Sequence, residues 1–339
     1  MKKIFSILAV LPLFTFAQSK KPSSKTLPLI QSISSDTLKG KFTQVLFTYD
    51  QSNRVIGITQ KEVLVSKTSP KTIPIENIVQ AQTFQYQGNS LDPYARKISS
   101  YEYHQDSLKW FLYAIEQQYF LYKDGQHVGD SALYLSNSCP GCYRPNGPQN
   151  LVWDEKKAEK RIGLLEQNSE KIYHQIGVSK PYSPADVYYE DYKLTPLSTI
   201  SEEANGHRYG NRGNDASYYT FTKYDSKVNP FNNLNIAKAL VNEKISLSFG
   251  SENLIRIGEG GDDGGTDFNW HYYNQHNTLE YNAKRNEESS HFKDSIGLSY
   301  TYNQFNQPVF CKADIKKQFT HNNELVGTYK KRFTFRYLK

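Results

Sequence analysis

Alternation of apolar and polar residues over short segments is the main pattern along this chain. Residues 332–337 read Arg-Phe-Thr-Phe-Arg-Tyr, which places the aromatic rings on one face of an extended strand and the polar side chains on the other. Similar short segments, rich in aromatic and β-branched residues, recur from residue 41 onward. They cover residues 41–48, 55–59, 62–65, 84–86, 99–103, 110–115, 119–122 and 132–135. The pattern predicts a succession of antiparallel strands.

Turn sequences between these segments predict hairpins. Asp124-Gly125 suits a two-residue hairpin turn because both residues tolerate positive φ. Residues 47–55 (FTYDQSNRV) and 300–309 (YTYNQFNQPV) repeat one arrangement, in which a tyrosine-bearing strand, an Asp/Asn-rich turn and a second strand follow one another. Consecutive hairpins favour a mainly β fold, and we expect an extended, curved antiparallel meander of β-hairpins.

Two segments in the middle of the chain indicate short helices. In residues 153–167, apolar residues recur at spacings of three to five with acidic residues early, although Gly163 disfavours a helix. Residues 229–242 open with Asn-Pro-Phe, and Pro230 suits the first turn of a helix. We therefore expect one or two short helices in the β-rich domain.

The N-terminus has the three parts of a secretory signal peptide: the basic Met1-Lys-Lys, an apolar run over residues 4–16, and a small-x-small end at Ala17. This run is shorter than the ~20 residues that a transmembrane helix needs, and no later stretch approaches that length. The sequence predicts a cleavable signal peptide at 1–17, a flexible leader at 18–36, and a single β-rich domain at 37–339, divisible into halves 37–180 and 181–339. The mature chain is expected to be exported without a transmembrane segment, and to be periplasmic, cell-surface or secreted.

Composition fits a folded, polar-faced β protein. The 339 residues include 26 tyrosines and 18 phenylalanines, which favour strands. The formal charge of +7 falls to +5 when the two lysines of the signal peptide are removed. Basic residues are dispersed, and the densest run, Lys330-Lys-Arg332, lies in an alternating strand. Since nucleic-acid binding requires clustered basic residues, we expect no nucleic-acid partner.

One repeated segment is similar to a known family. Residues Tyr49-Asp50-x-x-Asn53-Arg54-Val55 resemble the YD repeat of Rhs and teneurin-type proteins, with Asn53 in the place of the usual glycine. Asparagine shares glycine's left-handed backbone most readily, so this change is mild. The order of the three Tyr-turn segments, at 49–55, 224–231 and 300–309, also resembles a class of exported bacterial β-hairpin-sheet proteins of unknown function.

The resemblance implies an extended antiparallel sheet and no known catalytic residues. The repeats are too few for the closed shell of long Rhs proteins, so an open, curved sheet is expected. We predict that the residues of the motif serve turn geometry and strand pairing and not chemistry. These residues are Tyr49, Asp50, Asn53, Arg54, Tyr302 and Asn303.

The cysteines have several interpretations. Cys139-Pro-Gly-Cys142 is a C-x-x-C, for which a redox role needs a thiolate at a helix N-terminus, whereas the following residues are rich in Pro and Gly. A loop disulfide between Cys139 and Cys142 is favoured in an oxidising compartment, with redox catalysis and zinc as alternatives. Cys311 lies in a predicted strand and is expected to be a buried free thiol.

Residues 258–267 (GEGGDDGGTD) have the most unusual local composition. A phosphate loop is disfavoured because the carboxylates would repel the anion. Calcium is the better ligand, since Asp262, Asp263 and Asp267 offer hard oxygens on a flexible backbone, although their spacing is not that of an EF-hand. The alternative is a flexible hairpin loop. Apart from this calcium, no cofactor is expected.

Motifs of the common enzyme classes do not occur in the sequence. It contains no G-x-S-x-G, H-E-x-x-H or Walker motif. His271 and His276 are five apart and are interpreted as surface histidines. Acidic pairs such as Glu202-Glu203 and Asp262-Asp263 could serve a glycosidase, but adjacency in sequence says nothing about their separation in space. We therefore do not expect an enzyme.

Three classes of function remain. The favoured one is a non-catalytic exported envelope or surface binding protein, whose tyrosine-rich sheet would contact a glycan or a protein. The second is a carrier that holds a lipid or another hydrophobic ligand in a curved sheet. The third is a glycan-active hydrolase with two carboxylates across a cleft. The ligand and the oligomeric state cannot be read from the sequence.

Overall fold

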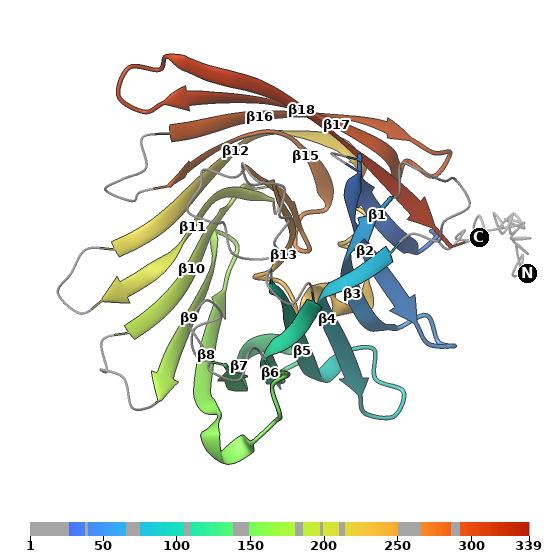
Figure 1. Cartoon of the computed structure of the whole chain (residues 1–339), viewed down its shortest axis with the longest axis vertical. Helices are drawn as coiled ribbons and strands as arrows, with labels where there is room; N and C mark the ends of the chain where they lie inside the picture. The colour runs from blue at the N-terminus through green and yellow to red at the C-terminus, as the bar shows by residue number, and fades with distance from the viewer. Residues whose placement is uncertain are drawn as a thin grey trace, which may run out of the picture.

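The wall of the molecule is a closed antiparallel barrel of 16 strands (Figure 1). The computed structural model describes residues 27–37, 40–65, 75–104, 109–137, 149–179, 186–196, 199–209, 214–249, 266–285 and 292–338. The wall strands are β1 (Ile30–Ser35), β2 (Lys41–Tyr49), β3 (Val55–Leu64), β4 (Ile75–Tyr86), β5 (Pro93–His104), β6 (Lys109–Lys123), β7 (Gln126–Ser136), β8 (Glu159–Gln167), β9 (Lys171–Ser179), β10 (Asp186–Leu194), β11 (Ile200–Tyr209), β12 (Asn214–Val228), β15 (His276–Arg285), β16 (Phe292–Tyr302), β17 (Pro308–Phe319) and β18 (Leu325–Tyr337).

The chain leaves the wall once, between β12 and β15. The described residues of this excursion, 229–249 and 266–275, are called the inner segment. They contain the 3-10 turn η2 (Asn235–Lys238) and the two-stranded sheet of β13 (Lys244–Phe249) and β14 (Thr266–His271). Figure 1 shows β13 inside the ring of wall strands. The inner segment therefore fills part of the barrel instead of extending its wall.

Aromatic packing joins the inner segment to the inner face of the wall. Phe333 of β18 meets Phe268 and Trp270 edge to face, with ring centroids 5.0 and 5.1 Å apart. All three side chains are at most 3% exposed. The wall strands thus direct their apolar face inward, and the core lies inside the barrel.

Tyrosine hydroxyls fasten neighbouring strands at one end of the barrel. Each lies at or near the end of a strand and donates to the backbone carbonyl at the start of the preceding strand. The donor–acceptor distances of Tyr49, Tyr86, Tyr122 and Tyr337 are 2.5–3.0 Å. The pairs are Tyr49 with Ile30, Tyr86 with Val55, Tyr122 with Pro93, Tyr224 with Ile200, and Tyr337 with Pro308. This end, called the tyrosine end, is where the candidate site lies.

The turns of the repeated segments are held by their Asp and Asn side chains. Asp50 accepts bonds from the backbone of Ser52 and Arg54, and its second oxygen pairs with the Arg54 guanidinium at 2.7 Å. Asn53 has φ of 62°, the left-handed conformation that asparagine tolerates. In the β16–β17 turn, Asn303 accepts backbone bonds from Phe305 and Gln307, while Tyr302 donates to Asp225.

The outer face of β15–β18 is polar in three adjacent rows of the sheet. Register places Glu280, Gly297, Asp314 and Lys330 in one row, Asn282, Ser295, Lys316 and Thr328 in the next, and Ser299, Lys312 and Arg332 in the third. Rows are two residues apart, so the three span ~14 Å at ~3.4 Å per residue. No side chain in these rows is apolar.

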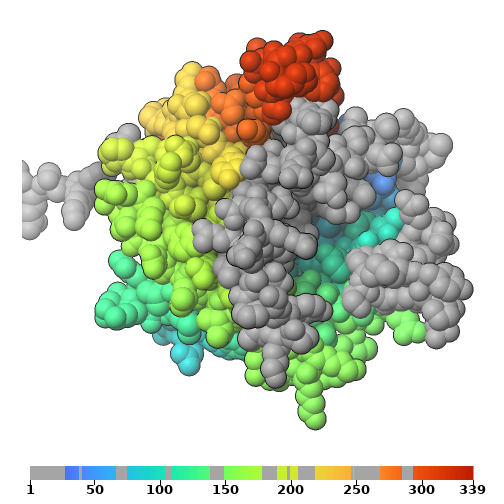
Figure 2. Space-filling model, turned by 90° about the vertical axis from the view of Figure 1, so that its left-hand side faces the viewer, coloured from blue at the N-terminus to red at the C-terminus, as the bar shows by residue number. Residues whose placement is uncertain are grey.

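Exposed apolar side chains gather on the outer face of β6–β8. Leu121 and Leu164 flank Gly129 in the register, and Tyr119 and Ile162 flank Ser131. These four large side chains are 42–61% exposed. Other exposed apolar side chains lie on β3, β4, β5, β12 and β18, among them Ile56, Ile75, Tyr94, Tyr218 and Tyr329. Figure 2 views the molecule from the side where β8–β11 lie in Figure 1, with the β17–β18 hairpin at the top.

The structure confirms a mainly β, antiparallel fold but not an open meander. β1 pairs with both β2 and β18, which closes the sheet and removes the two edges that an open sheet would expose. The leader predicted for 18–36 overlaps β1, so order begins earlier than expected. The signal peptide lies outside the described residues. Within the described chain, no helix is both long and apolar enough to cross a membrane.

The helix predicted for residues 153–167 is wrong. This stretch forms the short 3-10 turn η1 (Glu155–Lys157) and then β8. Leu165 faces the core, whereas Ile162 and Leu164 face outward, so the helical spacing was coincidental. The helix predicted for 229–242 is reduced to turns and η2, because its apolar residues are buried on several sides inside the barrel.

Candidate functional site

A pocket of about 590 Å³ lies between the tyrosine end of the wall and the inner segment. Its wall side is formed by turn residues, among them Leu91 and Asp92 before β5 and Gln126 at the start of β7. Exposed amides of Gln126, Gln167 and Gln275 stand at its rim. The size falls within the 300–1,000 Å³ typical of small-molecule sites.

The inner segment supplies the floor of the pocket. Leu234 and Val241 are buried beneath it and Ala237 lies between them in the chain. Asn235 of η2 holds this floor against the wall. Its amide nitrogen donates to the Tyr86 hydroxyl and to the Leu91 carbonyl, and its oxygen accepts from the Val55 backbone. The floor is therefore hydrogen-bonded to β3, β4 and the turn before β5.

His127 lines the pocket as a buried imidazole without a hydrogen bond. The residue is 5% exposed and is flanked by the rings of Phe120 and Tyr122, whose centroids are 5.5 and 5.9 Å away. The Gly129 backbone is near, yet neither ring nitrogen has a partner of normal geometry in the described chain. Burial lowers the pKa of His127. The ring is thus neutral at pH 7, with one donor and one acceptor nitrogen.

Tyr272 adds a second polar group to the same pocket. Its side chain is 2% exposed and lines the pocket. Burial raises its pKa well above the ordinary value, so the hydroxyl keeps its proton. Asp92 and Lys238, the two charged residues of the lining, pair with each other at 3.4 Å. The pocket is therefore close to electrically neutral.

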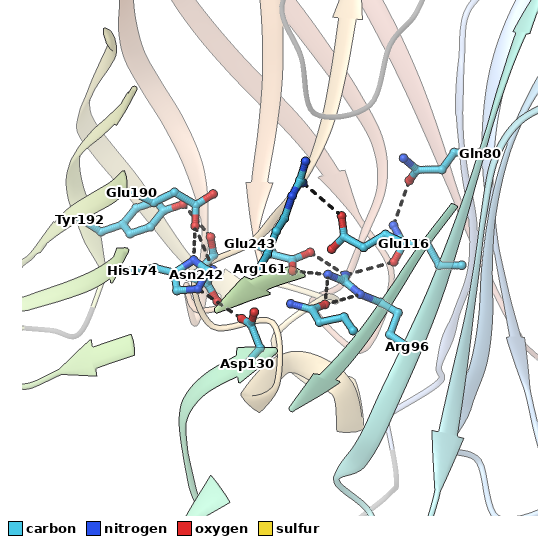
Figure 3. Close-up of polar contacts among 12 residues, drawn as sticks. Gln80, Arg96, Glu116, Asp130, Arg161, His174, Glu190, Tyr192, Asn242 and Glu243 are labelled. Carbon is cyan, nitrogen blue, oxygen red and sulfur yellow. Dashed lines mark hydrogen bonds and ion pairs between the residues drawn. The ribbon is translucent and has the colours of Figure 1, made fainter. Parts of the chain in front are cut away.

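A second polar region ties the inner segment to β5 and to β9–β11 of the wall (Figure 3). Asn242, Glu243 and Lys244, three consecutive residues at the entry to β13, each contact a different part of the wall. We call this tripeptide the latch. Glu243 forms two bonds, at 2.6 and 2.8 Å, with the guanidinium of Arg96, which is 4% exposed and also bonded to Gln118.

Asn242 of the latch joins a buried histidine between two carboxylates. His174 has Asp130 3.2 Å from Nε2 and Glu190 3.1 Å from Nδ1, and the Asn242 amide lies within hydrogen-bond reach of His174 and Glu190. Burial opposes the charge, but the bonds to Asp130 and Glu190 prevail and raise the pKa of His174 to about 10. The imidazolium is therefore a structural cation at neutral pH.

Lys244 of the latch pairs with Glu203, a fully buried carboxylate that also lies 3.2 Å from His271. Burial disfavours the charge on Glu203, yet Lys244 and His271 outweigh it and lower its pKa to about 2. The expectation that His271 is a surface residue is wrong, since it is 1% exposed.

The Glu202-Glu203 pair does not form a catalytic dyad. Adjacent residues of a strand point to opposite faces. Glu202 accordingly pairs with Lys193 at 2.6 Å on the exposed side of the wall, with both side chains at least 50% exposed. Glu203 points into the barrel. The two carboxylates are thus separated by the wall itself.

The remaining predicted site residues are only partly within the described chain. Cys139, Cys142, Asp262 and Asp263 lie outside it. Asp267 belongs to β14, where its backbone pairs with Ser248. Among the described residues, no group of three or more His, Cys, Asp or Glu side chains could hold a metal ion. Cys311 is a buried free cysteine, as the strand pattern indicated.

Sequence reasoning missed the pocket. Its lining comes from three hairpin turns and from the inner segment, and no local motif links these pieces. The one available signal was the asparagine content of residues 229–242 together with the pair Tyr272-Tyr273 further along the chain. Residues 229–242 were assigned to a helix, so their link to the turns was not made.

No family model matches the chain, and no curated protein does. The solved structures that are similar in shape include porin-like proteins from Bacteroides uniformis and Bacteroides vulgatus, each with a TM-score of 0.46 and 10% identity. They cover 91% and 92% of this chain, and 96% and 99% of their own chains are covered. The resemblance to YD-repeat proteins is overturned, because no such family model matches and the sheet closes into a barrel.

Proposed function

We propose that this protein is an exported, non-catalytic binding protein with a water-facing wall, and that it binds a small polar ligand in the pocket at the tyrosine end. One observation carries the proposal: the buried imidazole of His127, whose ring nitrogens have no hydrogen-bond partner in the described chain, lines a pocket of suitable size next to Tyr272. Buried polar groups are normally satisfied. We infer that a ligand supplies the hydrogen bonds that the His127 imidazole lacks.

The outer wall supports placing the protein in water. The alternative is a barrel embedded in lipid. Such a barrel needs an outward apolar band about 25 Å tall around its circumference. Here β15–β18 carry charged and polar side chains over ~14 Å of the outer face, including Asp314 and Glu280 with side chains 49% and 53% exposed. Lipid would leave these charges unsolvated.

The inner segment argues against a lipid carrier. A carrier requires a continuous apolar cavity, but the apolar inner face of β18 is covered by Phe268 and Trp270 of the chain itself. A glycan hydrolase would need free carboxylates, but two carboxylates inside the barrel are already paired. Glu203 and Glu243 both hold a cationic side chain of the fold.

A ligand screen tests the proposed function. The mature chain would be screened by thermal shift against a library of small polar compounds, followed by isothermal titration calorimetry. Ala237→Phe fills the floor of the pocket, and Ser299→Phe adds the same ring on the exposed outer wall as a control. We expect a ligand that binds the wild type and the control but not the filled variant. Binding that survives Ala237→Phe, or no binding in any class, would contradict the proposal.

A further inference from the structure

We infer that the ligand of this pocket is a neutral, hydroxyl-rich molecule, namely a carbohydrate. The inference rests on the proposed function and narrows it to a chemical class. The groups that line the pocket, and the charge that they lack, determine which ligand they can satisfy.

Charge is the first argument. Asp92 and Lys238 neutralise each other at 3.4 Å, and burial keeps His127 uncharged by lowering its pKa. Neither an anion nor a cation would therefore find an unpaired counter-charge in the lining. Bringing a charged ligand into a pocket without a counter-charge carries a desolvation penalty, so a neutral ligand is favoured.

Hydrogen-bond capacity is the second argument. A neutral imidazole, a tyrosine hydroxyl and a primary amide all combine donor and acceptor functions. His127, Tyr272 and the rim amides of Gln126, Gln167 and Gln275 provide such groups around one space. A sugar hydroxyl is likewise both donor and acceptor. A molecule with several hydroxyls can therefore satisfy this lining without carrying charge.

Apolar surface is the third argument. Leu234 and Val241 form an apolar floor, and Tyr273 presents a half-buried ring in the same lining. A pyranose has C–H faces that pack on apolar and aromatic side chains, while its edge carries hydroxyls. Binding sites of mixed character use apolar contact for affinity and a few placed polar groups for orientation.

The variant His127→Phe, which keeps an aromatic ring but removes both ring nitrogens, separates a ligand role from a structural one. In the free protein, the change removes two unsatisfied nitrogens, so stability should be unchanged or increased. In the complex, it removes the hydrogen bonds to the ligand, and we expect the affinity to fall by about 10- to 100-fold, as for the loss of one or two buried hydrogen bonds. Tyr272→Phe should act in the same direction.

The experiment is a thermal-shift and calorimetric panel on the mature chain. It compares neutral mono- and disaccharides with acidic sugars, amino acids, nucleosides and short peptides, each against wild type, His127→Phe and Ala237→Phe. We expect neutral saccharides to bind the wild type, His127→Phe to lose at least tenfold in affinity without losing thermal stability, and Ala237→Phe to lose binding.

Three results would overturn the inference in distinguishable ways. If amino acids, nucleosides or acidic sugars bind instead, and Ala237→Phe abolishes that binding, the carbohydrate class is wrong while the proposed binding function stands. If neutral saccharides bind with an affinity that His127→Phe leaves unchanged, this pocket is not their site. If no class binds, both the inference and the proposed function fail.

Discussion

Glu243→Gln is the sharpest test of how the inner segment is held. The change keeps the size of the side chain but removes the negative charge opposite Arg96, whose side chain is 4% exposed. Removing one partner of a buried ion pair costs about 3–5 kcal/mol because the other charge stays buried. Since the Glu243 side chain is 28% exposed and glutamine retains one acceptor, we expect a loss of about 2–4 kcal/mol in the free energy of unfolding.

The opposite variant, Arg96→Met, should cost less. Water can reach a carboxylate that is 28% exposed, so Glu243 remains solvated when the guanidinium is removed. The free energy of unfolding of the double variant should then be close to that of Arg96→Met, because the double variant leaves no buried unpaired charge. The structure thus predicts an asymmetric double-mutant cycle, in which the loss of the acid is the more damaging single change.

The assay is equilibrium urea unfolding followed by tryptophan fluorescence, with linear extrapolation of the free energy. Asp314→Asn is the matched acid-to-amide control, because Asp314 pairs with Lys312 on the outer wall and its side chain is 49% exposed. Exposed pairs contribute about 0–1 kcal/mol. The reasoning is refuted if Glu243→Gln destabilises the protein no more than Asp314→Asn does.

Three further variants probe the wall. Gly163→Ala would place a Cβ 2.4 Å from His174 Nε2 and 2.8 Å from Asp130, so we expect the free energy of unfolding to fall by at least about 2 kcal/mol. Gly177→Ala is the control, because its Cβ would meet only an atom 3.9 Å away. It should change stability little in the same urea titration. Because the pKa of His174 is raised to about 10, its contribution to stability is complete below about pH 6.5 and is lost as the pH rises towards 10. His174→Gln should therefore flatten the dependence of stability on pH between these values. If the wild type and the variant lose stability in parallel, His174 is not the structural cation. Tyr49→Phe removes the hydrogen bond from the Tyr49 hydroxyl to the Ile30 carbonyl, so the free energy of unfolding should fall by about 1 kcal/mol. Tyr119→Phe, at an exposed tyrosine, should leave it unchanged.

The strand content could be predicted from the sequence, but closure could not. Period-two alternation depends on each strand alone, and residues 332–337 do place their aromatic rings inward and their charges outward. Closure depends on β1 meeting β18, a contact between the two ends of the chain that no local pattern encodes. A six-residue strand next to a Ser- and Lys-rich leader gave too weak a signal.

The polar interior was also beyond local reasoning. Glu203 and His271 were each seen in the sequence but were interpreted as ordinary charged or surface residues, because their partners come from strands far away in the chain. Glu203 meets Lys244 41 residues later. Alternation could have shown that Glu202 and Glu203 face opposite sides. It could not have shown that one of the two sides is a packed barrel interior.

Flotation on lipid vesicles tests the central claim most directly, namely that this barrel carries its core inside and a water-facing surface outside. The mature chain, purified without detergent, would be mixed with vesicles of bacterial phospholipid and centrifuged through a density gradient beside a known outer-membrane barrel. The proposed water-facing wall predicts that the protein stays monodisperse without detergent and remains in the dense fractions. Recovery with the floating vesicles, together with a need for detergent, would contradict the account.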